Sequence, residues 1–301
     1  MQGSALSGRD LFAAAVVVIV WGTNFVAMKI GLRELTPFQM GAGRYLFALL
    51  PLVLVVRPPK LAWYRVLVYG LCQGVGQFGL LFLALRAGMS ASLASVLLQT
   101  QVFFTAVLGA MLLQEQVSRP MQAGMLVAAL GLACFVVNYF VSVPNGAGDV
   151  SIAGLLLVTG GAAMWAVSNI VVRLARRAAP VFDVLGFMVW SSLVPVIPFC
   201  MLSWWCDPPA SRTRLADLSW HTWAALAYLG WLATILGYAL WTGLLKRHPA
   251  NRIAPFSLGV PVVGISAGML MLDDRITGWQ WTGIACIVCS LVIVVSKRAP
   301  P

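Results

Sequence analysis

Long apolar stretches follow one another along the chain, and a few charged, proline or glycine residues separate each from the next. A helix needs about 20 apolar residues to cross about 30 Å of hydrocarbon. Ten stretches have about this length, so we expect an all-α integral membrane protein with ten transmembrane helices. The predicted helices cover residues 11–31, 38–56, 64–85, 90–113, 120–141, 152–173, 182–204, 220–245, 252–272 and 279–296.

The ten stretches form two sets of five that resemble each other. Matching residues near the start of the sets share an offset of 144, and those near the end share an offset of 159. The offset changes at the loop 205–219, which is longer than its counterpart 57–63. The pairs are Trp21 and Trp165, Lys29 and Arg173, and Pro51 and Pro195 at the first offset, and Ala91 and Ala250, Gly109 and Gly268, Glu115 and Asp274, and Gly124 and Gly283 at the second.

An odd number of helices in each set determines how the two sets are oriented. After five helices the chain enters the membrane from the opposite side, which is the inverted repeat of transporters that alternate access to a midplane site. We therefore expect a first repeat at 1–143, a second repeat at 150–301 and a linker at 144–149. The linker lies within a stretch rich in Pro, Gly and Asn.

Basic residues between the stretches are shared unequally between the two sides of the membrane. Cytoplasmic connections carry an excess of Lys and Arg, so the count of thirteen against six predicts that both termini are cytoplasmic. The thirteen are Arg9, Arg57, Lys60, Arg65, Arg119, Arg173, Arg176, Arg177, Lys246, Arg247, Arg252, Lys297 and Arg298. The six are Lys29, Arg33, Arg86, Arg212, Arg214 and Arg275.

The composition excludes a soluble protein. Of the 301 residues, 60% are hydrophobic and 10% are charged, and the mean hydropathy is +0.90. A soluble domain carries about 25% charged residues, and ten helices leave no room for a separate catalytic domain. The net charge of +11 comes from small groups of basic residues between apolar stretches, not from one solvated face. We therefore expect no nucleic-acid partner.

All nine carboxylates and both histidines lie at or beyond the ends of the predicted helices. A membrane enzyme needs a constellation of reactive groups at one depth, so we expect no enzyme, and no proton coupling through a mid-span carboxylate. Cys286 and Cys289 lie in an apolar stretch without partner Cys or His residues, so we predict neither metal nor cofactor. Cys200 and Cys206 lie near one loop, and the sequence does not determine whether they form a disulfide.

Neutral polar and aromatic residues lie in the middle of several predicted helices. Mid-span amides are costly in lipid and must face the interior, where they contact either substrate or one another. Arg44, the charge within the second helix, either binds a substrate carboxylate, snorkels outward, or binds Glu34 or helix-end carbonyls. The candidate substrate-binding residues are Trp21, Asn24, Arg44, Gln73, Gln77, Gln99, Trp165, Asn169, Tyr238 and Trp241.

Several segments resemble the EamA repeat of the drug/metabolite transporter superfamily. Those of the first half are V-W-G-T-N-F-V-A-M-K at 20–29, A-S-L-A-S-V-L-L-Q-T-Q-V-F-F-T at 91–105 and L-L-Q-E-Q at 112–116. Those of the second half are W-A-V-S-N-I-V-V-R at 165–173, V-P-V-V-G at 260–264 and L-D-D-R-I-T-G at 272–278. The resemblance spans essentially the whole chain. It implies a bacterial inner-membrane permease whose cavity is formed by helices one to four and six to nine, with the fifth and tenth packed outside.

Segments 86–95, 190–199, 233–245 and 251–264 are similar to EamA members that export O-acetylserine and cysteine. This resemblance implies a small-molecule substrate of the amino-acid metabolite class. The tryptophan and tyrosine rings favour the alternative of an exporter of aromatic amino acids or drug-like solutes. A membrane receptor would not explain the inverted repeat. Residue patterns determine neither the energy source nor the oligomeric state, and a monomer is compatible with them.

Overall fold

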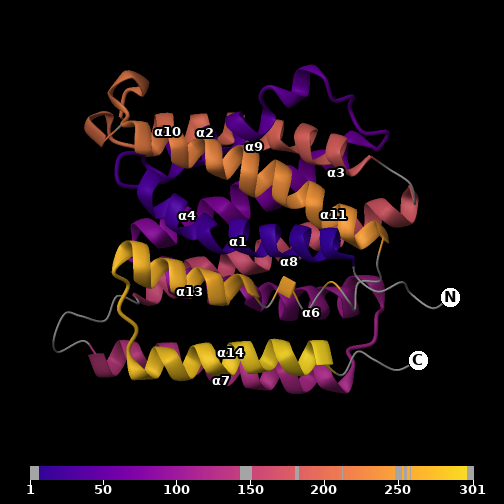
Figure 1. Ribbon diagram of the computed structural model, residues 1–301, viewed down its shortest axis with the longest axis vertical. Helices are drawn as coiled ribbons and strands as arrows, with labels where there is room; N and C mark the ends of the chain where they lie inside the picture. Colours follow the sequence, from indigo (N-terminus) through magenta and orange to yellow (C-terminus); the bar gives the residue numbers. More distant parts are fainter. Residues whose placement is uncertain are drawn as a thin grey trace.

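The computed structural model describes residues 7–142, 151–179, 183–211, 213–247, 253, 256, 257 and 259–296, and every regular element in these ranges is helical (Figure 1). The predicted linker 144–149 lies outside the described residues, as do Ala250, Arg212, Arg252, Lys297 and Arg298. The first half contains α1 (Gly8–Gly31), α2 (Pro37–Leu49), η1 (Leu52–Leu54), α3 (Trp63–Tyr69), η2 (Gly70–Phe78), α4 (Gly79–Arg86), α5 (Ala91–Leu97), η3 (Leu98–Thr100), α6 (Gln101–Leu113) and α7 (Arg119–Ser142). The second contains α8 (Ile152–Ala178), α9 (Val184–Cys206), η5 (Pro209–Ser211), η6 (Leu215–Asp217), α10 (Trp220–Ala227), η7 (Tyr228–Leu236), α11 (Gly237–Arg247), α13 (Gly259–Leu272) and α14 (Gly278–Ser296).

Seven helices in the described part are long and apolar enough to cross a membrane, and two shorter apolar helices, Gly259–Leu272 and Gly278–Val294, accompany them. The chain is therefore a multi-pass membrane protein. The second predicted span is shorter than expected, because α2 ends at Leu49, just before Pro51, which has no backbone N–H to continue the helix. The count of ten spans stays a prediction.

Polar side chains define where the helices begin. Ser7 and Thr36 precede α1 and α2 and each forms a capping box with the residue three positions later. Ser90 and Ser151 cap α5 and α8 in a similar way by accepting a backbone N–H. These caps satisfy backbone donors that would otherwise be stranded at the edge of the membrane.

Local structures recur at corresponding places in the two halves. The π-helices η2 and η7 each contain nine residues and start 158 positions apart. Gln114 and Asp273 follow the two corresponding helices and both adopt positive φ, at 56° and 54°. The sequence repeat is thus accompanied by a repeat of unusual backbone geometry.

The packing of the helices follows the same correspondence. Helix α1 packs on α13 as α8 packs on α6, and α2 packs on α9. Helices α7 and α14 pack mainly on each other, and Figure 1 shows this pair side by side along one edge of the bundle. The arrangement leaves the remaining helices to surround the centre of the protein.

The bundle has two ends, which we name from α1. End A is the end at which α1 begins and α14 finishes, on the right of Figure 1, and end B is the opposite end. Exposed aromatic side chains occupy both ends, with Trp63 and Tyr64 at end A and Trp204, Trp205 and Trp220 at end B. Such rings prefer the two membrane–water interfaces, so the helix axes run across the membrane.

Glycine allows two helices to approach closely at end B. A Cβ atom on Gly264 of α13 would lie 2.5 Å from the Cβ atom of Ser95 in α5. Gly74 has a similar role toward Pro195 of α9, where the corresponding distance is 2.6 Å. Both glycines belong to G-x-x-x-G motifs, which are typical of close packing between membrane helices.

We expect Gly264→Val to destabilise the protein by about 1–3 kcal/mol, because the added side chain has no space against α5. The decrease in Tm of the detergent-solubilised protein measures this effect. Gly278→Val is the matched control, since a Cβ atom at Gly278 meets nothing within 4 Å. Equal decreases in Tm for the two variants would contradict the packing argument.

Candidate functional site

A cavity of about 320 Å³ lies at the centre of the bundle. Its described lining residues come mainly from α1, α2, α3, η2, η3, α6, α8, α9, η7, α11 and α13, whereas α7 and α14 contribute none. Nine of the ten candidate residues line it, namely Trp21, Asn24, Arg44, Gln77, Gln99, Trp165, Asn169, Tyr238 and Trp241. The tenth, Gln73, lies beside Gln77 and lines a smaller neighbouring cavity.

Arg44 is the one charged side chain among the described residues that line the cavity. It is 2% exposed, and its two terminal nitrogens donate to Asn24 Oδ1 at 3.1 Å and to Thr234 Oγ1 at 3.2 Å. Its guanidinium carbon lies 3.8 Å from the centre of the Phe78 ring. Within the described part of the chain Nε has no hydrogen-bond partner. Arg44 therefore neither snorkels nor binds Glu34, and it retains a free donor.

Aromatic rings form one wall of the cavity. The ring of Trp21 lies 5.2 Å from that of Tyr238 and 5.6 Å from that of Trp241. Trp21 Nε1 donates to the carbonyl of Ala233 at 3.0 Å, within the π-helix η7. Gly237 permits this approach, because a Cβ atom there would lie 2.5 Å from the indole nitrogen. These contacts hold the indole ring against η7 and α11.

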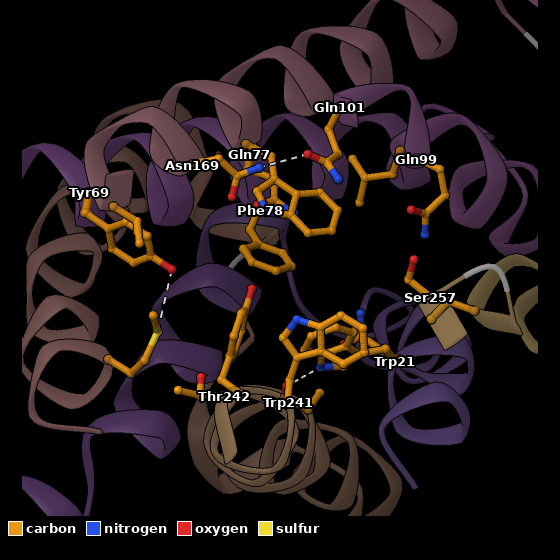
Figure 2. Close-up of a pocket in the computed structure, with 18 of the residues that line it drawn as sticks. Trp21, Tyr69, Gln77, Phe78, Gln99, Gln101, Asn169, Trp241, Thr242 and Ser257 are labelled. Carbon is orange, nitrogen blue, oxygen red and sulfur yellow. Dashed lines mark hydrogen bonds between the residues drawn. The ribbon is translucent and has the colours of Figure 1, made fainter. Parts of the chain in front are cut away.

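Amide side chains form the opposite wall. Asn169 Nδ2 donates to Gln101 Oε1 at 2.8 Å and lies 3.3 Å from Thr105 Oγ1. Figure 2 shows this pair, with Gln99 pointing into the cavity on the side of Ser257. The side chain of Gln99 makes no hydrogen bond to any described residue, so its amide is available to a solute.

Gln73 has a different environment from the other amides. Its Nε2 donates to Gln77 Oε1 and lies 3.5 Å from the Tyr238 hydroxyl, and its Oε1 accepts from Ser168 Oγ at 2.5 Å. The side chain is 5% exposed. Gln73 therefore connects η2 to α8 and α11 and supports the cavity wall from behind.

Other lining residues were absent from the candidates named from the sequence. Phe78 lies under the Arg44 guanidinium, and Met188 and Gln101 line the cavity. Thr234, which binds Arg44, lies on a π-helix. A phenylalanine or methionine within an apolar stretch gives no signal, but Gln101 is a mid-span amide and could have been included by the rule used for Gln99.

The cavity extends toward end A and stops at mid-helix on the side of end B. Its lining reaches Val184, the first residue of α9, and Ser257, both at end A. Large side chains without exposed surface fill the end-B half, including Met28, Leu81 and Phe82. The described conformation therefore gives access to the cavity from end A.

Hydrogen bonds between loops and helix ends close end B. Glu34 accepts from the Ser219 N–H at 2.9 Å and from Thr222 Oγ1 at 2.8 Å. Thr36 Oγ1 donates to Asp207 at 2.5 Å. The hydrogen bonds from Ser219 and Thr222 lower the pKa of the Glu34 carboxyl below its ordinary value of 4.5, and His221 adds a smaller effect in the same direction.

Gln73→Leu and Gln99→Leu form a matched pair of variants. Gln73→Leu leaves Ser168 without its side-chain acceptor and breaks the link to Gln77, so we expect a loss of about 1–3 kcal/mol of stability. Gln99→Leu removes no hydrogen bond to a described residue and should change stability by less than about 0.5 kcal/mol. The Tm of each variant measures these effects. A larger decrease in Tm for Gln99→Leu than for Gln73→Leu would contradict the assigned roles.

The Glu34 hydrogen bonds should make stability depend on pH. A lowered pKa means that the bonds contribute stability above the ordinary carboxyl value and lose it as pH falls through the lower value in the folded protein. We expect Tm to decrease more steeply below pH 4.5 in the unchanged protein than in Glu34→Gln. Parallel pH profiles would show that Glu34 does not contribute.

Comparison with known proteins places this architecture in a family. The model of the EamA-like transporter family matches residues 9–137 and again residues 152–296. The chain is 37% identical over 291 residues to a probable amino-acid metabolite efflux pump of Salmonella typhimurium (strain LT2), covering 96% of each protein. It is 36% identical over 291 residues to the protein of that name from Escherichia coli (strain K12), again covering 96% of each.

The fold itself has a counterpart among solved structures. One chain of 17% sequence identity superposes with a TM-score of 0.62 and covers 95% of this chain and 96% of its own length. At that identity the match concerns the fold alone. The two family matches and the two relatives above 30% identity establish the family as well as the fold. The chain belongs to the EamA-like transporter family and is a transporter, not an enzyme.

Proposed function

We propose that this transporter exports small amino-acid metabolites, with cysteine and O-acetylserine as the first candidates, across the inner membrane of a bacterial cell. The observation that carries the proposal is Arg44, a buried guanidinium with an unused Nε donor in a cavity of about 320 Å³. A guanidinium binds a carboxylate through paired, charge-assisted hydrogen bonds. The relatives named as probable amino-acid metabolite efflux pumps support the same class of solute.

The proposed mechanism is alternating access by ten helices in two inverted repeats, 1–143 and 150–301, joined at 144–149. The excess of Lys and Arg at end A supports a cytoplasmic location for that end and for both termini. In this assignment the described conformation receives solute from the cytoplasm. A second conformation, closed at end A and open at end B, would release it outside.

Export of aromatic amino acids or drug-like solutes is the second candidate function. The rings of Tyr238 and Trp241 lie 5.2 and 5.6 Å from the ring of Trp21 at the cavity wall, and Trp165 also lines the cavity. A planar solute could stack on these rings. The two candidates differ in whether the rings or the amides contact the part of the solute beyond its carboxylate.

Efflux from preloaded vesicles separates these candidates. We expect labelled cysteine and O-acetylserine to leave vesicles that contain the protein, and unlabelled forms of each to compete. Export of tryptophan together with no export of, or competition by, the small solutes would favour the second candidate. Absence of export for every amino acid tested would contradict the first candidate and the export of aromatic amino acids.

Arg44→Met should raise the half-saturation concentration for carboxylate solutes at least about tenfold, because it removes a charge-assisted hydrogen-bonding group. Arg44→Lys keeps the charge but not the paired donors, and should recover only part of the affinity. The exposed Arg119, outside the cavity, provides the control variant Arg119→Met. Unchanged half-saturation in folded Arg44→Met would remove Arg44 from the binding site.

A further inference from the structure

A second polar pocket, of about 380 Å³, lies at end B, apart from the central cavity. The outer ends of α1, α4 and α13 form it, and its charged side chains are Lys29, Arg33, Arg86 and Asp274. We call it the end-B pocket. Three basic residues and one acidic residue give this lining a net charge of about +2.

The end-B pocket has a counterpart at end A. A pocket of about 270 Å³ there contains Glu115 and Arg173, and it shares Gln101 and Asn169 with the central cavity. The sequence repeat pairs Glu115 with Asp274 at the offset of 159, and Arg173 with Lys29 at the offset of 144. The two pockets are therefore equivalent places in the two halves.

The equivalence relates the pockets to the two conformations of alternating access. In an inverted repeat, the opposite conformation is reached when the halves exchange their arrangements. The end-A pocket now adjoins the cavity, so in the opposite conformation the end-B pocket would adjoin it. At present Asp274 closes this route, since it accepts from the N–H and Oγ of Ser92 at 3.0 and 2.7 Å.

We propose that the end-B pocket is the exit subsite, which receives the carboxylate of the solute after it leaves Arg44. The proposal rests on the proposed function, because it assumes export from end A to end B. It deepens that function by adding a second anion-binding position on the route and by requiring a solute with a free carboxylate.

The two pockets differ in the net charge of their linings, and the difference favours movement of a carboxylate into the end-B pocket. At end A, the charged side chains in the described pocket lining are Glu115 and Arg173, which pair at 2.6 Å, so this lining has no net charge. At end B, Arg86 donates to the carbonyl of Leu32 at 2.9 Å, which orients its guanidinium without a full opposing charge. The described lining of the end-B pocket therefore carries more net positive charge than that of the end-A pocket, which favours a carboxylate there.

The experiment measures affinity separately from each side of the membrane. Protein reconstituted in one orientation is assayed for half-saturation by labelled O-acetylserine presented at end B, as exchange, and at end A. We expect Arg86→Gln and Arg33→Gln each to raise the end-B value about three- to tenfold and to leave the end-A value unchanged. The increase should be larger at low ionic strength, because exposed charges are screened by salt.

Arg214→Gln is the matched control, since Arg214 is also exposed at end B but lies outside the pocket. Arg86→Lys should keep most of the affinity, and Arg33→Gln provides the test if Arg86→Gln fails to fold. If the half-saturation concentration at end B in the variants equals that of the unchanged protein, or rises equally on both sides, the exit subsite alone is overturned. Absence of O-acetylserine transport by the unchanged protein would instead overturn the proposed function, and the exit subsite with it.

Discussion

The solvation of one buried guanidinium is the constraint that organises the centre of this protein. Arginine cannot lose its proton in a protein, and a charge removed from water is costly unless polar groups replace the water. Arg44 obtains that replacement from the Asn24 amide, the Thr234 hydroxyl and the Phe78 ring. These groups come from α1, η7 and η2, so three helices must meet α2 at one depth. Rotation of any one of them would remove one of these partners from the charge.

The two π-helices make this meeting compatible with a polar cavity. A π-helix carries an extra residue per turn and leaves backbone groups with altered partners, which is why such segments often mark functional sites. In η7, Thr234 binds both Arg44 and the carbonyl of Leu229, while the carbonyl of Ala233 accepts from Trp21. In η2, Gln77 and Phe78 follow one another and both line the cavity. The irregular backbone occurs where it lines a cavity, as membrane depth requires.

Much of this organisation could be predicted from the sequence, and the rest depended on contacts that leave no pattern. The described helices lie within a few residues of the predicted ones, except that α2 ends before Pro51 and α13 starts at Gly259 and not near residue 252. The cost of stranding an amide in lipid was enough to predict that Asn24 and Gln99 face the interior. That argument could not distinguish Gln73, which supports the wall of the cavity from behind, from Gln99, which faces into the cavity. Phe78 was not predictable, because its role depends on a π-helical turn that hydropathy does not report.

The cavity-lining arginine has consequences for how the two halves can differ. The residue that corresponds to Arg44 in the second half, 144 positions later, is Met188, which also lines the cavity. The halves share an architecture, yet among the described lining residues only the first half contributes a charge, so the charge of the cavity wall is asymmetric. A dipolar solute would therefore pass through the cavity in one orientation, with its carboxylate toward α2. If Arg44 binds the solute carboxylate as proposed, the second half is free to vary its uncharged lining, and a change in the preferred solute need not alter the carboxylate-binding residue.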